Sequence, residues 1–355
     1  MESMSIENAG EDSVRIFFGP AIEGLSSCLE GRGPVFLVYD SNVGMHADKV
    51  KACVPVVSAL ALDVSETAKT IRTVMDICSW LLEKGADRNA ILLAVGGGIL
   101  TDMAGFAAAI YKRGIRVSYV PTTLLAQVDA SVGGKTGVNF YGYKNMLGVI
   151  RQPDFTYICR EVLETLPYEH ILEGAAEMIK TFIIKDNGNY RKAVGLFSGM
   201  RSGHMDLQSG PEARVLSELV REAVAVKAEI VSEDQFESGA RRKLNLGHTF
   251  AHAIEWCDHG ISHGQAVSIG MVCAARLSEA EGICSKGLAD RIRSDLEACG
   301  LRTDMPFPAS VLADAMDKDK KAENGKINFV LIKEIGTVQI VPLTSGSVVE
   351  SFERI

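Results

Sequence analysis

The sequence predicts an α/β domain followed by a mainly α-helical domain. Two observations indicate this fold class. The first half of the chain alternates short apolar segments with segments of helical spacing, which is typical of a parallel sheet covered by helices. In the second half nearly every segment has helical spacing instead. The length of 355 residues fits two domains of roughly 150 residues or more, and we expect them at residues 1–164 and 165–355.

The first half contains segments that predict strands and helices in alternation. Short apolar runs at residues 35–39, 91–95 and 115–120 predict strands. Residues 71–84 repeat apolar side chains at helical spacing and residues 100–111 are rich in alanine, so both segments predict helices. Strands that alternate with helices pair in parallel, so the first domain is expected to be Rossmann-like.

The second half is dominated by amphipathic segments that predict helices. They lie at residues 169–185, 212–232, 247–257, 265–281 and 286–299. Weak strand patterns return only at residues 327–332 and 337–341. The second domain is therefore expected to be mainly helical, with a short β segment near its end.

Composition and charge exclude several classes of protein. The 47% of hydrophobic and 23% of charged residues are typical of a globular chain. A net charge of −8 argues against nucleic acid as a main partner, because phosphate backbones bind basic surfaces. No apolar run approaches the ~18 residues of a membrane span, and the polar, acidic start is unlike a signal peptide. Eight scattered cysteines without a Cys-x-x-Cys pair indicate reduced thiols, so we expect a cytoplasmic protein without a membrane partner.

A glycine-rich turn at residues 96–98 follows the second predicted strand and precedes a helix that contains Asp102. Such glycines let the backbone approach a pyrophosphate, which the helix N-terminus also attracts. A tight turn without a ligand explains them equally well, because the full Gly-x-Gly-x-x-Gly pattern is absent. Asp40 and Asn42 follow the first predicted strand, where they suit either ribose hydroxyls or loop capping.

Residues 126–145 form a polar, glycine-containing segment that we expect to be a loop. It contains Asp129, Lys135 and Lys144, which together suit a polyhydroxylated anion. The segment is not a P-loop, because the position of the first P-loop glycine, five residues before Gly134, is occupied by Asp129. A plain surface turn is the less favoured alternative.

Four of the seven histidines lie close together around one predicted helix. His248 and His252 are four residues apart, a spacing that suits a divalent metal. His263 and the carboxylate of Glu177 add to a His/His/Glu pattern of the catalytic zinc type. Solvated or capping histidines, and an ion pair between Glu177 and Lys180, are the alternatives. The density of histidines favours the metal.

Together these motifs resemble the 3-dehydroquinate synthase family. The runs that carry the resemblance follow the family's order over most of residues 35–330, which makes the match specific. They are residues 65–70, 96–102, 111–114, 121–129, 133–139, 144–145, 177–180, 244–255 and 263–264. The resemblance implies an NAD-binding domain followed by a metal- and substrate-binding domain.

The activity that the resemblance implies is that of an NAD- and metal-dependent, phosphate-eliminating carbon–oxygen lyase. It would convert 3-deoxy-D-arabino-heptulosonate 7-phosphate to 3-dehydroquinate and phosphate in the shikimate pathway, which leads to chorismate and the aromatic amino acids. The implied steps are alcohol oxidation, phosphate β-elimination, carbonyl reduction, ring opening and intramolecular aldol closure. NAD⁺ is regenerated in every cycle and so acts as a catalytic cofactor.

The resemblance also implies the site residues and changes the metal hypothesis. The Zn²⁺ or Co²⁺ ligands would be Glu177, His248 and His263, whereas His252 would lie near the substrate and assist proton transfer. The implied NAD contacts are Asp40, Asn42, Glu66, Lys69, Gly97, Gly98, Asp102, Thr122, Thr123, Lys135, Lys144 and Thr165. The implied catalytic and substrate contacts are His252, Lys135, Asp129, Asn245, Lys227, Arg241, Lys180, Lys144, Asn145, Arg113 and Lys320.

Three details of the resemblance concern single residues. Arg113 matches an arginine that reaches the phosphate in a neighbouring subunit, which implies a homodimer. Lys320 and Lys321 compete for one phosphate-binding position. Thr101 stands where the family usually has a glycine, so its side chain would narrow the approach to the pyrophosphate and require a modest local adjustment.

Other functions remain as alternatives. A sister sugar-phosphate cyclase would share the fold, NAD and metal, but would differ where the substrate carboxylate binds. A polyol or glycerol-phosphate dehydrogenase would need no cluster of lysines and arginines and would release NADH. A non-catalytic binding protein would have no use for the complete set of charged residues. Arg241, Asn245 and His252 match the dehydroquinate pattern and favour that function.

Overall fold

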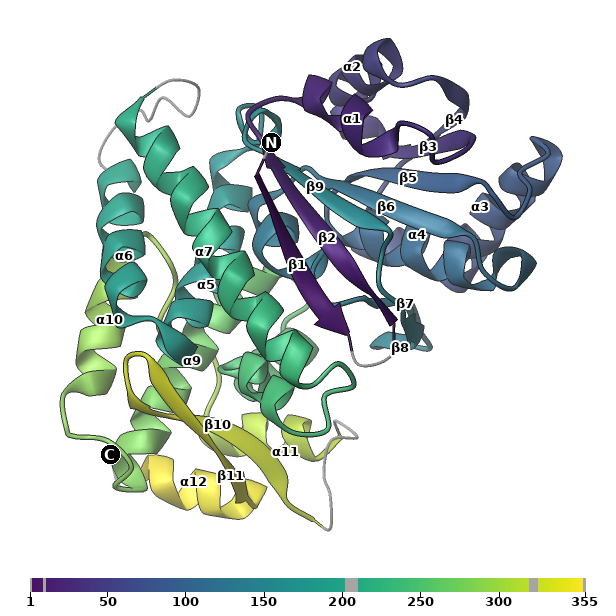
Figure 1. Ribbon diagram of the computed structural model, residues 1–355. Helices are drawn as coiled ribbons and strands as arrows, with labels where there is room; N and C mark the ends of the chain where they lie inside the picture. Colours follow the sequence, from purple (N-terminus) through teal and green to yellow (C-terminus); the bar gives the residue numbers. More distant parts are fainter. Residues whose placement is uncertain (1, 9–10, 202–209, 319–324, 354–355) are drawn as a thin grey trace. The chain divides into compact units, whose positions relative to one another are not determined.

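The computed structural model of the chain describes residues 2–8, 11–201, 210–318 and 325–353 (Figure 1). These residues divide into two compact units, with the division between Pro167 and Tyr168. The sequence places this boundary after residue 164. No helix within the described ranges is both long and apolar enough to cross a membrane.

The first unit is built on a seven-stranded sheet of order β1-β2-β9-β6-β5-β3-β4. All neighbouring strands pair in parallel except β1 and β2. The parallel sheet with flanking helices is confirmed, although the sequence predicted only β3, β5 and β6. The strands are β1 Glu2–Asn8, β2 Glu11–Gly19, β3 Val35–Asp40, β4 Val56–Leu62, β5 Ile91–Gly96, β6 Arg116–Pro121 and β9 Phe155–Cys159.

Helices cover both faces of this sheet because the central strands are apolar on both sides. Phe36 and Val38 point toward α3 (Ile71–Glu83) and α4 (Gly98–Ile110), with which they form one buried core. Leu37, between them in β3, is also fully buried and faces the other side. The shorter helices α1 (Leu25–Leu29) and α2 (Gly44–Cys53) lie on that other side (Figure 1).

The strand order reverses between β3 and β5. The chain runs from β3 outward to β4 on one side, then returns to place β5, β6 and β9 on the other side. Open parallel sheets bind ligands at such a reversal, in the crevice at the carboxyl ends of the strands. Here these ends are Asp40 of β3 and Gly96 of β5.

The expectation of a loop over residues 126–145 is wrong. The segment forms a π-helical turn, η5 (Ala126–Ala130), and then a hairpin of β7 (Lys135–Phe140) and β8 (Tyr143–Ile150). Tyr141 and Gly142 form its turn with φ of 48° and 83°, the positive values that suit the twist of a two-residue hairpin turn. The hairpin is separate from the large sheet and β7 packs against α4.

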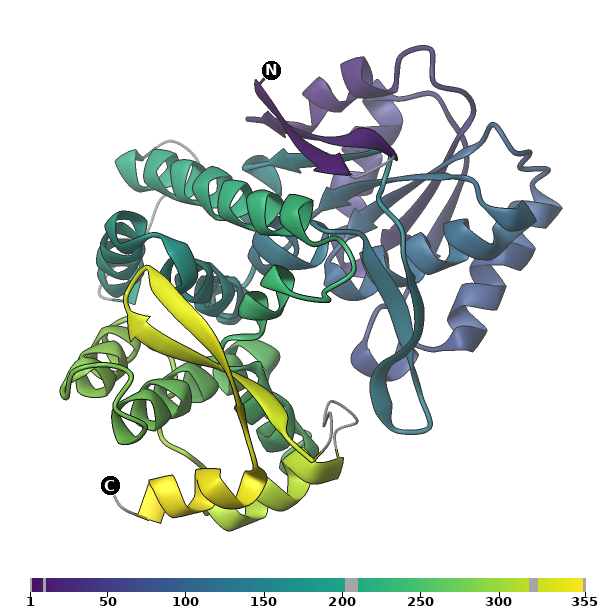
Figure 2. The same ribbon diagram turned by 60° about the horizontal axis from the view of Figure 1, so that its bottom comes forward.

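The second unit is mainly helical, as predicted, and carries one β-hairpin. Figure 2 shows the hairpin laid across the helices, and β10 packs against α9. The elements are α5 Tyr168–Lys185, α6 Asn187–Arg201, α7 Pro211–Glu233, η7 Ala240–Asn245, α8 His248–Cys257, α9 His263–Ala280, α10 Leu288–Ala298, α11 Ala309–Lys318, β10 Ile327–Glu334, β11 Thr337–Leu343 and α12 Ser345–Glu353.

Glycines allow α9 to approach its neighbours very closely. A Cβ added at Gly270 would lie 2.1 Å from the carbonyl oxygen of Gly247, just before α8. A Cβ at Gly264 would lie 2.4 Å from Cα of Glu173 in α5. Because real Cβ atoms do not come this close to backbone, both glycines are needed to bring α5, α8 and α9 together.

Candidate active site

Three potential metal ligands converge in the second unit. Glu177 of α5, His248 at the start of α8 and His263 at the start of α9 place one ligand atom each within 4.8 Å of one another. Nε2 of His248 and Nε2 of His263 lie 3.6 and 3.4 Å from Oε1 of Glu177. One carboxylate and two imidazoles are a donor set that suits Zn²⁺ and similar ions.

Both histidines are oriented by groups on their outer side. Nδ1 of His248 lies 3.2 Å from the carbonyl oxygen of Leu246. That oxygen only accepts, so Nδ1 carries the hydrogen and the lone pair is on Nε2. Nδ1 of His263 donates to Oε1 of the buried Glu255 at 3.1 Å. Outer partners of this kind are typical of metal-ligating histidines.

The charges around Glu177 keep it ionised although it is fully buried. Burial raises its pKa, but Lys180, His248 and His263 outweigh burial and hold the pKa well below its ordinary value. Lys180 forms an ion pair with Oε2. Even so, neither carboxylate oxygen accepts a well-oriented hydrogen bond within the described residues. A buried carboxylate in this state fits a metal ligand.

The two histidines differ in their pKa. Burial and the charge of Lys180 lower the pKa of His248 well below its usual value, so its imidazole is neutral. Burial also lowers the pKa of His263, but the contacts with Glu177 and Glu255 raise it to about 10. A divalent ion held by Nε2 of His263 would have to displace a proton from that atom.

His252 is outside the group of three. It lies one turn after His248 in α8, with ring centroids 5.6 Å apart, but it shares no common ligand position with Glu177 and His263. The ring of His263 is 5.4 Å from that of His248. The geometry thus brings together the three residues that the resemblance implies, and His252, which helical spacing alone suggested, is not part of that group.

The second unit buries three of the expected substrate-binding cations. Lys180, Lys227 and Arg241 are 1%, 6% and 2% exposed. They lie in α5, α7 and η7, elements that pack against one another. Three cations gathered on packed elements form a local positive charge, which suits an anionic ligand.

A loop between α7 and η7 holds Arg241 in place. Asp234 accepts hydrogen bonds from the backbone N–H groups of Ser238, Gly239 and Arg241 at 3.0, 2.6 and 3.0 Å. Burial raises the pKa of Asp234, but these bonds lower it to about 2. The guanidinium of Arg241 donates to the carbonyl oxygen of Gln235 at 2.6 Å.

Two further substrate contacts that the resemblance implies are Asn245 and Lys320. Asn245 lies at the end of η7, whereas Lys320 lies outside the residues that the structure describes. Asn245 ends η7, and its Nδ2 donates to Oε1 of Glu237 at 2.6 Å. Lys320 and its alternative Lys321 fall within residues 319–324 and lie outside the described residues. Glu237 has a φ of 60°, and such strain in a non-glycine residue is common at functional sites.

The first unit assembles the glycine-rich turn at the reversal of strand order. Gly97 is the residue before α4, and Gly98 is its first residue. A Cβ at Gly96 would lie 3.4 Å from Cβ of Asp40, so the ends of β3 and β5 are adjacent. A Cβ at Gly98 would lie 2.8 Å from Cβ of Ala130 in η5. The turn therefore requires glycine for packing, and the N–H groups of α4 suit a pyrophosphate.

The remaining cofactor candidates surround this turn. Oδ1 of Asp40 accepts two bonds of 3.0 Å from Asn42, one from its backbone N–H and one from Nδ2. The backbone N–H of Thr122 donates to Gly96 at 2.9 Å, and Oγ1 of Thr123 accepts from Ala126 at 3.1 Å. These contacts fix the segments that follow β3 and β6, both expected to meet the cofactor.

Thr165 is an exposed residue held by a buried histidine. Nε2 of His46 lies 3.1 Å from Oγ1 of Thr165, and His46 is 2% exposed. Burial lowers the pKa of His46, so its ring is neutral. In the tautomer that carries its hydrogen on Nε2, the ring donates to the hydroxyl oxygen of Thr165. The hydrogen of Thr165 then remains available for a ligand.

Lys69 connects two of the expected contacts. It is 5% exposed, and its Nζ donates to Oδ2 of Asp102 at 2.6 Å and to Oδ1 of Asn145 at 2.5 Å. Asp102 lies in α4 and Asn145 in β8. Asp129 belongs to η5, whereas Lys135 and Lys144 are exposed residues at the start of β7 and in β8.

Thr101 does not narrow the approach to the glycine-rich turn. Its side chain is 1% exposed, and Oγ1 donates to the carbonyl oxygen of Gly98 within the same helix at 3.0 Å. A threonine hydroxyl in a helix commonly bonds back to the preceding turn in this way. The side chain of Thr101 is therefore accommodated within the described residues by burial and by a bond to its own helix.

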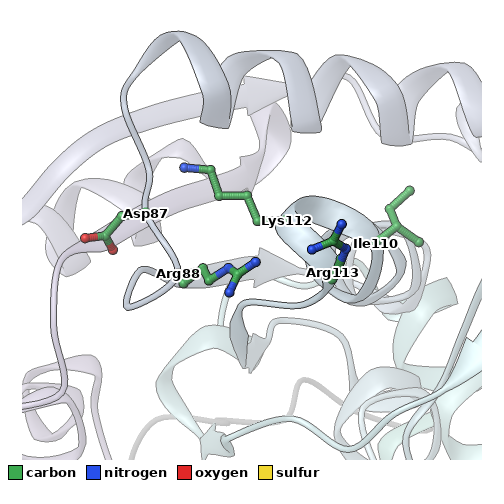
Figure 3. Close-up of a pocket in the computed structure, with 5 residues that line it drawn as sticks. All are labelled: Asp87, Arg88, Ile110, Lys112 and Arg113. Carbon is green, nitrogen blue, oxygen red and sulfur yellow. The ribbon is translucent and has the colours of Figure 1, made fainter.

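Arg113 lies apart from the other candidates of the first unit. It follows α4, whose 13 residues separate it from the glycine-rich turn by about 18 Å of helix. It lines an open pocket of about 720 Å³ with Asp87, Arg88, Ile110 and Lys112 (Figure 3). Lys112 and Arg113 have φ of 49° and 67°, a strained backbone that is common at functional positions.

Comparison with known proteins identifies the family. Models of the 3-dehydroquinate synthase N-terminal and C-terminal regions match residues 59–173 and 174–322. A 3-dehydroquinate synthase of Pyrococcus abyssi is 40% identical over 330 residues, which cover 92% of this chain and 94% of that protein. The chain belongs to the 3-dehydroquinate synthase family. A second 3-dehydroquinate synthase, from Acidithiobacillus ferrooxidans, is 38% identical and covers 96% of this chain and 94% of its own.

Solved structures share the fold of this 3-dehydroquinate synthase family member. A 2-epi-5-epi-valiolone synthase from Streptomyces hygroscopicus, solved with NAD⁺ and Zn²⁺ bound, has a TM-score of 0.88 at 25% identity over 98% of each chain. A 2-deoxy-scyllo-inosose synthase, complexed with carbaglucose-6-phosphate, NAD⁺ and Co²⁺, has a TM-score of 0.83 at 22% identity over 99% of each chain. A probable glycerol dehydrogenase from Sinorhizobium meliloti has a lower TM-score of 0.62 at 16% identity, covering 96% of this chain and 95% of its own.

Several residues of the site were not singled out from the sequence. Glu255, Asp234 and His46 hold His263, the Arg241 loop and Thr165. Glu255 lies eight residues before His263, and the two meet only because the chain reverses between α8 and α9. Glu255 ends the run 244–255 that carries the resemblance and lies within the histidine cluster, and these were the signals for it, whereas nothing in the sequence pattern marks His46.

Proposed function

We propose that the chain is a 3-dehydroquinate synthase that converts 3-deoxy-D-arabino-heptulosonate 7-phosphate to 3-dehydroquinate and phosphate. The observation that carries this proposal is the cluster of Glu177, His248 and His263 in a unit that also buries Lys180 and Arg241. Relatives that share 38–40% of their residues over more than nine-tenths of the chain are named 3-dehydroquinate synthases. The reaction makes the chain a phosphate-eliminating carbon–oxygen lyase of aromatic biosynthesis.

Glu177, His248 and His263 would hold a divalent metal ion, Zn²⁺ or Co²⁺. Their ligand atoms are close enough to share one ion, and Leu246 and Glu255 fix both imidazoles with Nε2 on the inner side. A bound metal ion supplies Lewis acidity, which lowers the pKa of a hydroxyl group that it contacts. The 2-epi-5-epi-valiolone synthase of the same fold carries Zn²⁺.

Residues of the first unit would hold NAD⁺. The glycine-rich turn before α4 fits a pyrophosphate, and Asp40 at the end of β3 fits a ribose. Both lie at the carboxyl ends of strands where the strand order reverses, which is where open parallel sheets bind dinucleotides. NAD⁺ supplies reversible hydride transfer when bound. The proposed set is completed by Glu66, Lys69, Asp102, Thr122, Thr123, Thr165, Lys135 and Lys144. Asn145, whose side chain meets Lys69, is proposed to contact the substrate.

The protein's own side chains would bind the anionic groups of the substrate and move its protons. Lys180, Lys227 and Arg241 would bind the carboxylate and the phosphate, and the packing of the three elements that carry them supports this role. Asn245 and Asp129 would bind hydroxyl groups. The imidazole of His252 would transfer protons, because it lies beside the metal-binding group without belonging to it.

We also propose a cytoplasmic homodimer in which Arg113 serves the partner's site. Its distance along α4 from the glycine-rich turn and its exposed, strained position support a role toward another molecule. All eight cysteines are among the described residues and none of them forms a disulfide, which supports a reducing compartment. Nucleic acid and membranes are not proposed as partners.

The proposal is tested by mixing the purified chain with Zn²⁺ or Co²⁺, a catalytic amount of NAD⁺ and the heptulosonate phosphate. We expect release of inorganic phosphate without net accumulation of NADH, since hydride returns in each cycle. Stoichiometric NADH would instead identify a dehydrogenase. Turnover only with a heptulose or hexose phosphate that lacks the carboxylate would identify a sister cyclase.

A further inference from the structure

Asn139 contacts several expected cofactor and substrate residues but was not assigned to any site. Its Nδ2 donates to Oε1 of Glu66 at 2.7 Å. Its Oδ1 accepts from the backbone N–H of Asn145 at 2.9 Å. Its own backbone N–H donates to the carbonyl oxygen of Lys69 at 3.0 Å. All three partners belong to the set proposed to bind NAD⁺ or substrate.

These contacts extend into one continuous chain of hydrogen bonds. From Asn145 the chain continues through Oδ1 to Nζ of Lys69 at 2.5 Å, and from Lys69 to Oδ2 of Asp102 at 2.6 Å. It joins the short helix η3 (Glu66–Ala68), the β7–β8 hairpin and α4. Asn139 is the member that connects the Glu66 end to the Lys69 and Asp102 end.

An irregularity in the hairpin directs Asn139 toward these residues. The pairing of β7 with β8 shifts between Val138 and Phe140, so Asn139 is skipped. It pairs instead with Thr70, which lies next to Lys69. Irregularities of this kind commonly turn a side chain toward a functional site. The hairpin thus presents Nδ2 of Asn139 to Glu66 in η3, while Oδ1 accepts from the backbone of Asn145 in β8.

The bond from Asn139 also supports an unusual backbone conformation. Asn145 has a φ of 51°, a left-handed value that costs roughly 1 kcal/mol or more for a residue with a side chain. The hydrogen bond from its backbone N–H to Asn139 helps to hold this conformation. In this conformation the side chain of Asn145 reaches Lys69.

We propose that Asn139 is a positioning residue that sets Glu66, Lys69 and Asn145 for NAD⁺ and substrate. The inference rests on the proposed function, because it is that function which assigns these residues to ligands. Only an amide fits both roles, since Nδ2 must donate to a carboxylate while Oδ1 accepts from a backbone N–H. Aspartate would keep the acceptor but set a second carboxylate against Glu66.

The first experiment is titration of NAD⁺ into the purified protein by calorimetry, which needs no turnover. For Asn139→Asp we expect the dissociation constant to rise about tenfold, as for loss of one hydrogen bond to a charged group. The KM for the heptulosonate phosphate should change by less than about twofold, because the acceptor for Asn145 remains. Asn139→Ala removes both bonds and should raise both constants.

The matched control is Asn189→Asp in α6. Nδ2 of Asn189 also donates to a carboxylate, Oδ2 of Asp186, at the same 2.7 Å, and it lies in the second unit away from the proposed contacts. Asn139→Asp and Asn189→Asp should lower the melting temperature by similar amounts. Only Asn139→Asp should weaken NAD⁺ binding. An equal loss of NAD⁺ affinity in Asn189→Asp would show a general effect and overturn the inference.

A double-variant cycle with Glu66→Gln tests the route of action. If Asn139 acts through Glu66, Asn139→Asp adds less than about twofold to the dissociation constant of Glu66→Gln. If the fold-increases in the dissociation constant caused by the two single variants multiply in the double variant, the inference is overturned. Wild-type NAD⁺ affinity in both Asn139→Asp and Asn139→Ala would also overturn it. Absence of NAD⁺ binding by the unchanged protein would instead overturn the proposed function, and the inference with it.

Discussion

At the residue scale, the proposed metal centre depends on two imidazoles and one carboxylate. Each imidazole is oriented by a hydrogen bond at Nδ1, and neighbouring cations keep the carboxylate ionised. Glu177 is fully buried, and the cations around it keep its pKa low. His263 is held by Glu255 and His248 by a backbone carbonyl. The metal ligands are therefore oriented before an ion binds, which reduces the conformational entropy that binding costs.

Substitutions of single histidines separate metal binding from proton transfer. We expect His263→Ala to lose bound metal, because two ligands are too few for a stable catalytic site. His252→Ala should retain the metal and lose turnover, since His252 is outside the group of three. Metal content by plasma mass spectrometry after gel filtration, together with phosphate release, measures both. Loss of metal in His252→Ala would show that the ligand set is wrong.

Asp234 links the stability of the Arg241 loop to pH. Its pKa is about 2 in the folded protein, below the value of about 3.9 in an unfolded chain. A lowered carboxylate pKa adds stability above pH of about 4, and this stability is lost as the pH falls toward 2. Asp234→Asn should therefore lower the melting temperature at neutral pH, with a difference from wild type that shrinks below pH of about 4.

The same variant should raise the KM for the phosphate substrate, because Arg241 loses its backbone anchor. Asp186→Asn is the control. Asp186 accepts bonds from Asn189 in the same unit, so its loss should lower the melting temperature without changing KM. A KM for Asp234→Asn equal to that of wild type would show that the loop does not position Arg241.

The sequence predicted the residue types of the metal site but not their grouping. Helical spacing favoured His248 and His252, and His263 and Glu177 were added as further candidates of a His/His/Glu pattern. The resemblance then selected Glu177, His248 and His263 and left His252 out. The reason is that the three ligands come from α5, α8 and α9, so no local period connects them. Glu255 and Asp234 were missed for the same reason, since their roles depend on how loops reverse.

At the element scale, the position of α9 decides whether the metal ligands meet. His263 is the first residue of α9, and the helix is held against α5 and α8 by contacts at Gly264 and Gly270. Small residues at these points let the backbones approach closely. The geometry of the site is thus determined by helix packing as well as by the ligands themselves.

Gly270→Ala tests this dependence. Its Cβ would lie 2.1 Å from the carbonyl oxygen of Gly247, so α8 and α9 must separate, at a cost of about 1–3 kcal/mol. We expect a lower melting temperature and weaker metal binding in a competition with a chelator. In Gly195→Ala, on α6, the Cβ meets nothing within 4 Å. That control should be neutral or more stable by up to about 1 kcal/mol.

Some elements with strong apolar patterns were predicted, although the apolar strands β4 and β9 were not. The buried strands β3, β5 and β6 were predicted from sequence. The β7–β8 hairpin was missed because Gly133, Gly134, Gly137 and Lys135 are typical of a loop. Its strands depend instead on close pairing, as a Cβ at Gly148 would lie 2.0 Å from the carbonyl oxygen of Thr136.

At the scale of the whole molecule, the proposed dimer predicts complementation between inactive variants. Arg113→Ala and His252→Ala should each have little activity alone. In a mixed dimer one site lacks both residues and the other has both, so subunit exchange should restore about a quarter of wild-type phosphate release. A mixture of His252→Ala and Lys227→Ala is the control and should restore none. A mass for the unchanged protein that corresponds to a monomer would contradict the dimer.

The two compact units have a further consequence for how the chemistry can change. The proposed metal ligands all follow Tyr168, and the proposed NAD⁺ contacts all precede Pro167. Each proposed cofactor site would therefore be formed by a single unit. A substitution that weakens the proposed metal ligands would leave the proposed NAD⁺ contacts intact, and the reverse also holds. The two cofactors could therefore be exchanged or lost independently of each other.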